Sequence, residues 1–289
     1  MGYNTLFFIH ENTGMALSTL IQELQKQYQL DKREIEVVMT YVLKINTAGL
    51  FIYDKELQQP QLDTIHQLLE KRQQGIPFAY LTGTKDFWSL SLNVNEYTLI
   101  PRPETELIVE YVLEKTPSDF DGSILDLGTG TGAIALSLAL ERPKANIFAI
   151  DQCSKCVATA MSNKDKYQLT NVTILQSNWF ENLTGKRFDF VISNPPYIAK
   201  DDCHLSNLQF EPRSALVANK KGYSDLEHII NHAKLHMTKT AQLILEHGYN
   251  QSEVVQQKLK SNCYLNVKSH RDLAGIQRIT TADAPKSCY

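Results

Sequence analysis

Four consecutive residues, Asn194-Pro195-Pro196-Tyr197, follow the apolar segment FDFVIS (188–193) and carry the side chains best suited to chemistry. The two prolines hold φ near roughly −65° and supply no backbone N–H, so the turn is rigid and presents mainly acceptors. The Asn194 carboxamide oxygen and the nearby carbonyls can accept both hydrogens of a planar –NH2 group. Tyr197 adds an aromatic face for stacking. The turn therefore predicts catalytic and substrate-binding residues for an amide or aromatic amine.

Such a nitrogen is a poor nucleophile because its lone pair is delocalised. Acceptors that hold its two hydrogens aim it at an electrophilic carbon and supply in-line geometry. The same acceptors stabilise the positive charge that develops on the nitrogen as a methyl group is transferred to it. The alternative is a rigid surface turn without chemistry, which a glycine-rich segment in the same predicted sheet makes the weaker interpretation.

That glycine-rich segment, DLGTGTG (126–132), lies where the predicted strand SILDLG (123–128) leads into the predicted helix AIALSLALER (133–142). Glycine permits a positive φ there and lets a ligand approach a backbone that carries no Cβ. In an open α/β sheet, ligands bind in the crevice beyond the strand ends. Dinucleotide-binding proteins use similar turns, so the glycines alone do not identify the ligand.

Asp151 ends the next predicted strand, NIFAID (146–151), nineteen residues after Gly132. A carboxylate at this place can accept hydrogen bonds from both hydroxyls of a ribose. The chain has no Walker sequence with its Lys-Ser/Thr, so a phosphate clamp is not supported. A nucleoside held without a phosphate clamp indicates S-adenosyl-L-methionine, and a dinucleotide remains the alternative on these residues alone.

The elements that must position these residues fall into parts with different periodicity. Residues 1–83 show helical spacing in three stripes, at 17–28, 35–43 and 62–69, and predict a small helical domain. Asp31 and Glu34 have the spacing of a capping box before the second stripe. This part is nearly neutral, which argues against a basic nucleic-acid-binding arm.

Residues 84–104 predict a hairpin linker, because apolar and polar residues alternate over 90–95. Residues 105–289 then alternate apolar strand segments with helical segments. This order predicts an α/β domain with a mostly parallel sheet covered on both faces. Its remaining expected strands are VTIL (172–175), FDFVIS and AQLILE (241–246).

Composition excludes several classes of protein. The 289 residues include 29 basic and 32 acidic ones, a net charge of −3, so no overall positive field favours nucleic acid. Apolar runs are far shorter than the roughly 18 residues of a membrane span, and the first residues lack the pattern of a signal peptide. Five cysteines, an odd number, favour a reducing cytoplasm, and their spacing predicts no metal site.

Further segments make the chain similar to one family. The turn at 194–197 and five further segments resemble the PrmC/HemK family of peptide-chain release factor glutamine methyltransferases. These segments are IPFAYLTG (76–83), Phe87-Trp88, LIPRPETE (99–106), EPRSAL (211–216) and RDLAG (271–275). The resemblance implies a Rossmann-like class I S-adenosylmethionine-dependent methyltransferase fold with a helical N-terminal domain. It also implies N(5)-methylation of the glutamine in the Gly-Gly-Gln motif of class I release factors, which modulates translation termination. S-adenosyl-L-homocysteine would be the second product.

The resemblance also implies roles for particular residues. Asn194 to Tyr197 would hold the glutamine amide, and the helical domain, by its position, would recognise the protein substrate. Cofactor contacts would come from Gly128, Thr129, Gly130, Thr131, Gly132, Asp151, Trp179 and Asn194. For Trp179, burial in the core is an equally weighted alternative.

One residue and two segments depart from the family's pattern. Asn178 stands where the family commonly has an acidic residue. The segment 221–226 differs from the usual Asp-Gly-Leu, and the segment 246–248 differs from the usual Glu-Ile-Gly. The sequence does not assign roles to five charged residues in the segments 99–106 and 211–216, namely Arg102, Glu104, Glu106, Glu211 and Arg213.

Other functions stay open at this point. The same turn and cofactor would serve methylation of a glutamine in a large-subunit ribosomal protein. An adenine-N(6) nucleic-acid methyltransferase would show a basic face, whereas residues 86–289 carry 21 basic and 23 acidic residues. A cofactor-binding protein without catalysis would have no use for an intact Asn-Pro-Pro-Tyr turn.

Overall fold

The computed structural model describes residues 17–286, which divide into two compact units at Leu81 and Thr82. The first residues of the predicted helical domain, and the segment considered as a signal peptide, lie outside this range. No helix of the described chain is both long and apolar enough to cross a membrane. Each unit has its own hydrophobic core.

The first unit is a small helical bundle, as the periodicity predicts. Its helices are α1 (Leu17–Tyr28), α2 (Lys32–Leu43), α3 (Thr47–Phe51) and α4 (Gln59–Gln73), and α5 (Phe78–Thr82) ends at the boundary. Apolar side chains spaced three or four residues apart form its core, among them Leu24, Ile35, Met39, Ile65 and Leu69.

The predicted capping box of α2 forms only in part. The Asp31 carboxylate accepts a hydrogen bond from the backbone N–H of Glu34 at 2.8 Å, which caps the helix. The Glu34 carboxylate instead pairs with Arg72 of α4. The second carboxylate therefore joins two helices rather than completing the cap.

The predicted hairpin is present as β1 (Thr84–Phe87) and β2 (Leu90–Asn93), which pair antiparallel. Its backbone is held by the second unit: Trp88 N–H donates to Glu106 at 2.7 Å, and Asn93 N–H donates to the Asn163 side chain at 2.7 Å. The hairpin thus belongs structurally to the second unit.

The second unit contains a seven-stranded mixed sheet in the order β5-β4-β3-β6-β7-β9-β8. The five predicted strands are parallel to one another, and β9 pairs antiparallel with both β7 and β8. The strands are β3 (Ser123–Leu127), β4 (Asn146–Asp151), β5 (Val172–Gln176), β6 (Phe188–Ser193), β7 (Met237–Glu246), β8 (Leu265–Arg271) and β9 (Gln277–Asp283).

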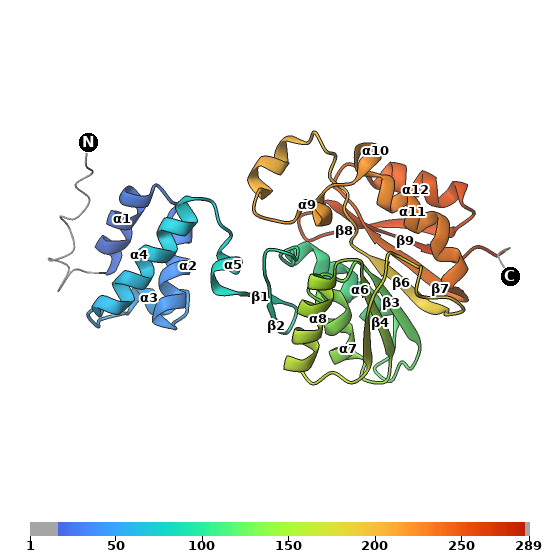
Figure 1. The fold of residues 1–289 in the computed structure, drawn as a ribbon, viewed down its shortest axis with the longest axis horizontal. Coiled ribbons are helices and arrows are strands. Elements are labelled where there is room, and N and C mark those ends of the chain that lie inside the picture. Colours follow the sequence, from blue (N-terminus) through green and yellow to red (C-terminus); the bar gives the residue numbers. More distant parts are fainter. Residues whose placement is uncertain (1–16, 287–289) are drawn as a thin grey trace. The chain divides into compact units, whose positions relative to one another are not determined.

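Helices cover both faces of this sheet (Figure 1). One face packs against α6 (Glu106–Lys115), α7 (Ala133–Glu141) and α8 (Ser154–Lys166), and the other against α11 (Ser224–Ala233) and α12 (Ser252–Ser261). Shorter helical segments lie in the connections: α9 (Arg213–Leu216), α10 (Asn219–Gly222), η1 (Pro103–Thr105), η2 (Cys203–Leu208) and η3 (Lys234–His236). Burial on both faces explains the nearly continuous apolar runs of the central strands.

Candidate active site

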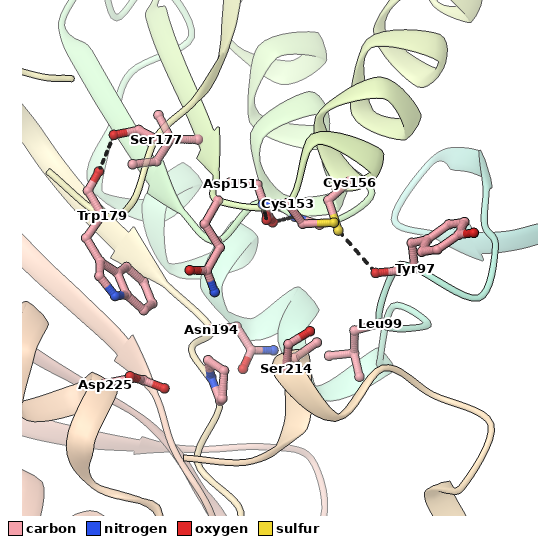
Figure 2. Close-up of a pocket in the computed structure, with 16 residues that line it drawn as sticks. Tyr97, Leu99, Asp151, Cys153, Cys156, Ser177, Trp179, Asn194, Ser214 and Asp225 are labelled. Atoms are coloured by element: carbon pink, nitrogen blue, oxygen red, sulfur yellow. Dashed lines mark hydrogen bonds between the residues drawn. The ribbon is translucent and has the colours of Figure 1, made fainter. Parts of the chain in front are cut away.

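A cavity of about 180 Å³ opens beyond the carboxyl ends of β3, β4 and β6. The chain leaves β3 toward β4 on one side and returns through β6 on the other, so this is the point where the strand order reverses. Such a point is where open α/β sheets bind ligands. Both motifs singled out in the sequence contribute to the wall of this one cavity (Figure 2).

The glycine turn follows β3 and has positive φ at all three glycines, with values of 76° at Gly128, 57° at Gly130 and 85° at Gly132. Gly128 and Gly130 line the cavity, and a Cβ on Gly130 would meet no atom within 4 Å. Side chains at these two positions would fill the space that a ligand needs. At Gly132, a Cβ would come within 2.8 Å of Leu136.

The threonines of the turn are bonded to residues behind the cavity wall. The Thr129 hydroxyl donates to the Asp126 carboxylate at 2.6 Å, and the Thr131 carbonyl accepts from the Asn163 side chain at 2.9 Å. Both threonines are buried, and neither they nor Gly132 line the cavity. Of the predicted cofactor residues, these three lie in the turn outside the cavity lining.

Asp151 lies opposite the turn, at the end of β4. Its two oxygens accept backbone N–H groups, one from Gly130 at 3.0 Å and the other from Cys153 at 2.9 Å. Burial raises its pKa, and these two hydrogen bonds counteract the increase. A carboxylate has about four lone-pair sites, so Asp151 can still accept bonds from a ligand.

Asp126, beneath the turn, is fully buried, and burial raises its pKa to about 7. The nearby charge of Asp151 acts in the same direction, whereas the hydrogen bond from Thr129 opposes it. Two carboxyl groups therefore lie close together under one face of the cavity, and a charge on one disfavours a charge on the other.

Trp179 and Asp225 stand at one end of the cavity, while Tyr97 and Leu99 stand at the other, with Asn194 between them (Figure 2). Trp179 has a φ of 48° and approaches to 4.0 Å from the position of a Cβ on Gly128. Its indole is therefore part of the wall and not only of the core. Asn178 is exposed, bonds to Glu181 at 2.7 Å and does not line the cavity.

The Asn-Pro-Pro-Tyr turn divides its residues between two cavities. Asn194 and Pro196 line the cavity with the glycine turn, and Pro195 is buried beneath them. Tyr197 lines a neighbouring cavity of about 310 Å³. The turn is fixed from behind, because the Tyr197 carbonyl accepts a hydrogen bond from Gln251 at 3.0 Å.

Gly222 is the one residue of 221–226 that must be glycine. Its φ is 88°, and a Cβ there would lie 2.2 Å from the Tyr197 carbonyl oxygen. The residues that depart from the family's pattern around Gly222 therefore leave unchanged the close approach of Gly222 to the Tyr197 backbone.

Three of the five charged residues without predicted roles join segments of the chain, and two are exposed. Glu211, buried, accepts the Ile100 N–H at 3.1 Å and pairs with Arg102, which joins the segments 99–106 and 211–216. Glu106 anchors the hairpin through Trp88. Glu104 and Arg213 are exposed.

Cys156 is buried, and its thiol donates to the Tyr97 carbonyl at 3.1 Å. Burial raises the pKa of this thiol, so it stays protonated at neutral pH. Among residues 17–286, the one cluster with metal-ligand geometry is Asp202-Cys203-His204, at the surface.

Several wall residues are absent from the sequence prediction: Tyr97, Leu99, Gln152, Ser177, Ser214, Ala215 and Asp225. Leu99, Ser214 and Ala215 belong to segments that carry the family resemblance, and Gln152 follows Asp151 directly. For Asp225, on α11, no local pattern marks a ligand-binding position. Glu246, fully buried at the end of β7, does not line the cavity, and burial raises its pKa to about 7.

Comparisons with known proteins agree with this architecture. A family model described as the PrmC N-terminal domain matches residues 15–83, and one described as the methyltransferase small domain matches residues 104–260. The release factor glutamine methyltransferase of Salmonella typhimurium is 46% identical over 252 residues, which cover 86% of this chain and 91% of that protein. The Escherichia coli K12 protein of the same name is 40% identical over 267 residues, covering 91% and 96%.

Among solved structures, a methyltransferase from Pyrococcus furiosus superposes with a TM-score of 0.54 at 18% identity, covering 75% of this chain and 99% of that one. The predicted fold class is confirmed: a Rossmann-like class I methyltransferase sheet with a β-hairpin and a helical N-terminal domain.

Proposed function

The chain belongs to the release factor glutamine methyltransferase family, and from that premise we propose that it methylates the side-chain amide of a glutamine in a class I release factor. The target is the glutamine of the Gly-Gly-Gln motif, and the methyl donor is S-adenosyl-L-methionine. One observation supports this most: the glycine turn, Asp151 and Asn194 border a single cavity.

The residues around the cavity fit the methyl donor. The turn leaves open space where Gly130 would carry a Cβ, and Asp151 keeps acceptor sites for ribose hydroxyls. Trp179 offers a flat apolar surface for an adenine ring. When bound, S-adenosyl-L-methionine would supply an electrophilic methyl group on a sulfonium.

Asn194 and the backbone of its turn would hold the substrate. The carboxamide oxygen and a turn carbonyl would accept the two hydrogens of the glutamine –NH2 and orient its nitrogen toward the donor side of the cavity. These acceptors would also stabilise the positive charge that develops on the nitrogen. Tyr197 borders the neighbouring cavity, so its ring would contact the substrate outside the reacting amide.

The helical unit is proposed to grip the release factor at a distance from the glutamine. It exposes apolar side chains that do not serve its own core, with Phe51 76% and Ile52 82% exposed. Two adjacent exposed apolar side chains support a protein contact at this end of the unit. Phe51→Ser should raise the KM for the release factor severalfold and leave kcat unchanged, whereas an equal kcat and KM would contradict the proposed grip.

A reducing, cytoplasmic location is part of the proposal, because release factors act there on ribosomes. The described cysteines, Cys153, Cys156, Cys203 and Cys263, are all free thiols, which is compatible with it.

A labelling experiment tests the function. The purified chain is incubated with radiolabelled S-adenosyl-L-methionine and, separately, a class I release factor, a large-subunit ribosomal protein and a DNA duplex. We expect label on the release factor, and none when the glutamine of its Gly-Gly-Gln motif is replaced by alanine. Label on the ribosomal protein alone, or on DNA alone, would overturn the proposal.

A further inference from the structure

One end of the cavity combines an aromatic surface with a carboxylate that the proposed function leaves unused. Trp179 and Asp225 lie at this end, and both line the cavity (Figure 2). The carboxylates in the lining are those of Asp151 and Asp225. Asp151 already accepts the backbone N–H groups of Gly130 and Cys153, and it is assigned to the ribose. Asp225 is therefore the carboxylate available at the aromatic end.

Helix α11 holds Asp225 beside the indole. The ring centroids of His228, which lies on the same helix, and Trp179 are 6.1 Å apart. Residues three apart lie on one face of a helix, so Asp225 and His228 share the face that packs toward Trp179. The Trp179 backbone is held independently, because its carbonyl accepts the Ser177 hydroxyl at 3.0 Å. The indole and the carboxylate are thus positioned by two segments distant in sequence.

The environment of Asp225 differs from that of the neighbouring acid on α11. Asp225 and Glu227 both lie in the first turn, where a negative charge stabilises the helix. Glu227 pairs with Lys220 at 2.7 Å and with Lys258 at 2.6 Å. In the part of the chain that the structure describes, no ion pair includes Asp225. Burial raises the pKa of Asp225, so a donor supplied by a ligand would stabilise its charge.

A carboxylate at the aromatic end can distinguish purine bases. It only accepts hydrogen bonds, whereas a carboxamide or a hydroxyl can donate or accept. Adenine carries an exocyclic amine, which donates, and hypoxanthine carries a carbonyl oxygen at the same ring position, which only accepts. Two acceptors that face each other leave both without a partner, and an unpaired polar group in a cavity lowers affinity. A flat indole has no such preference, because both bases offer it the same face.

We propose that Asp225 is a specificity-determining residue that accepts a hydrogen bond from the exocyclic amine of the adenine of S-adenosyl-L-methionine. This inference rests on the proposed function, because it concerns the methyl donor of the same cavity. Asn178, next to Trp179 in sequence, does not compete for this role, because it is exposed, bonds to Glu181 at 2.7 Å and lies outside the lining. Trp179 then supplies contact area for the base, and Asp225 selects which base it is.

Calorimetric binding of two ligands that differ in one group tests the proposal. S-adenosyl-L-homocysteine and S-inosyl-L-homocysteine share the ribose and the amino acid, and the second has a carbonyl oxygen in place of the adenine amine. The natural chain should bind the adenosyl compound at least about tenfold more tightly. Asp225→Ala should weaken binding of the adenosyl compound by about the same factor and change binding of the inosyl compound little, so the preference disappears.

Asp225→Asn gives a readout that a structural role would not produce. Its carboxamide has nearly the shape of the carboxylate and can turn its –NH2 toward the carbonyl oxygen of hypoxanthine. We therefore expect Asp225→Asn to bind the inosyl compound more tightly than the natural chain does. Glu227→Gln is the matched control, because it changes an acid in the same helical turn that lies outside the lining, and it should keep the natural preference. Melting temperatures establish that each variant is folded.

The proposal is overturned if the natural chain binds both compounds equally, or if Asp225→Asn keeps the full preference for the adenosyl compound. Equal losses of affinity for both compounds in Asp225→Ala would mark a structural role and also overturn it. Should Asp225→Ala fail to fold, the natural chain and Asp225→Asn decide.

The proposed function fails in a different way. A natural chain that prefers the adenosyl compound but methylates no release factor would refute the substrate assignment and leave the role of Asp225 standing. A natural chain that methylates the release factor but binds both compounds equally would refute the role of Asp225 alone.

Discussion

The two walls of the cavity are built in different ways. On the side proposed to bind the methyl donor, the glycine turn is held by partners close in sequence. Thr129 bonds to Asp126 three residues away, and Gly130 bonds to Asp151 twenty-one residues away. On the side proposed to bind the glutamine amide, the partners are distant in sequence. Asn194 bonds to Thr105 across 89 residues, and the Tyr197 carbonyl bonds to Gln251 across 54 residues. The wall with the glycine turn, called the donor wall after the methyl donor, is therefore held by contacts that are short in sequence. The wall with Asn194, called the acceptor wall after the methyl acceptor, depends on the assembled sheet.

The comparison separates the effects expected from substitutions. Changes on the donor wall should alter affinity for the methyl donor, and changes on the acceptor wall should alter turnover. A variant that changes both the affinity for the methyl donor and the turnover would contradict this division between the two walls.

The largest effect is expected for Asn194→Ala. Removing a preorganised polar group from the transition state commonly costs 10²- to 10³-fold, so kcat should fall by about that factor. Affinity for S-adenosyl-L-methionine, measured by calorimetry, should change less than tenfold. Asn178→Ala is the matched control, because Asn178 is exposed and outside the cavity, and it should retain normal turnover. Near-normal kcat in Asn194→Ala would refute the acceptor role.

Asp151→Ala tests the donor wall. A hydrogen bond to a charged group contributes about 1.5–3 kcal/mol, so the dissociation constant of S-adenosyl-L-methionine should rise about 10- to 100-fold. Part of this loss would arise because Gly130 also loses its partner. Asp151→Asn, which keeps one acceptor oxygen, should lose less. An unchanged dissociation constant in calorimetry would remove Asp151 from the site.

Trp179→Ala should weaken donor binding about two- to tenfold, since an aromatic contact contributes about 0.5–1.5 kcal/mol beyond its buried area. Trp88→Phe provides the comparison, because the Trp88 indole bonds to Glu141 and does not line the cavity. Equal dissociation constants for the two variants would assign Trp179 to the core.

The smallest effect concerns stability. Asp126 has a pKa raised from 3.8 to about 7, so the neutral form favours folding. That contribution is complete below about pH 4 and is lost as the pH rises through about 7. The melting temperature of the natural chain should therefore decrease between pH 5 and pH 8 more than that of Asp126→Asn, by about a few degrees. Glu246 titrates in the same range, so part of the decrease should persist in the variant. Parallel melting profiles would contradict the raised pKa.

The difference between short-range and long-range contacts also explains which parts of the structure the sequence could predict. Strands β3, β4 and β6 and the turns after them carry apolar runs, glycines and prolines whose effects are local, and they were located correctly. The antiparallel pair of β8 and β9 was missed, because polar residues alternate with few apolar ones over Leu265–Arg271. Strand pairing there depends on β7 and not on local pattern.

Along the cavity, the sequence pointed to several lining residues but not to their hydrogen-bond partners. The threonines at 129 and 131 share the glycine turn, and only the folded chain reveals that the Thr129 hydroxyl bonds to Asp126 and the Thr131 carbonyl to Asn163. Thr105 lies 89 residues from Asn194 along the chain, and only the fold brings its hydroxyl to the Asn194 side chain. Spacing along a chain carries no information about such long-range contacts.

Locating the transferred methyl group by tandem mass spectrometry tests the central claim most directly. A class I release factor treated with the natural chain and S-adenosyl-L-methionine should carry one methyl group, on the side-chain nitrogen of the Gly-Gly-Gln glutamine. A methyl group on a carboxylate oxygen, a backbone atom or another side chain would contradict an acceptor corner that holds a planar –NH2 group beside the donor.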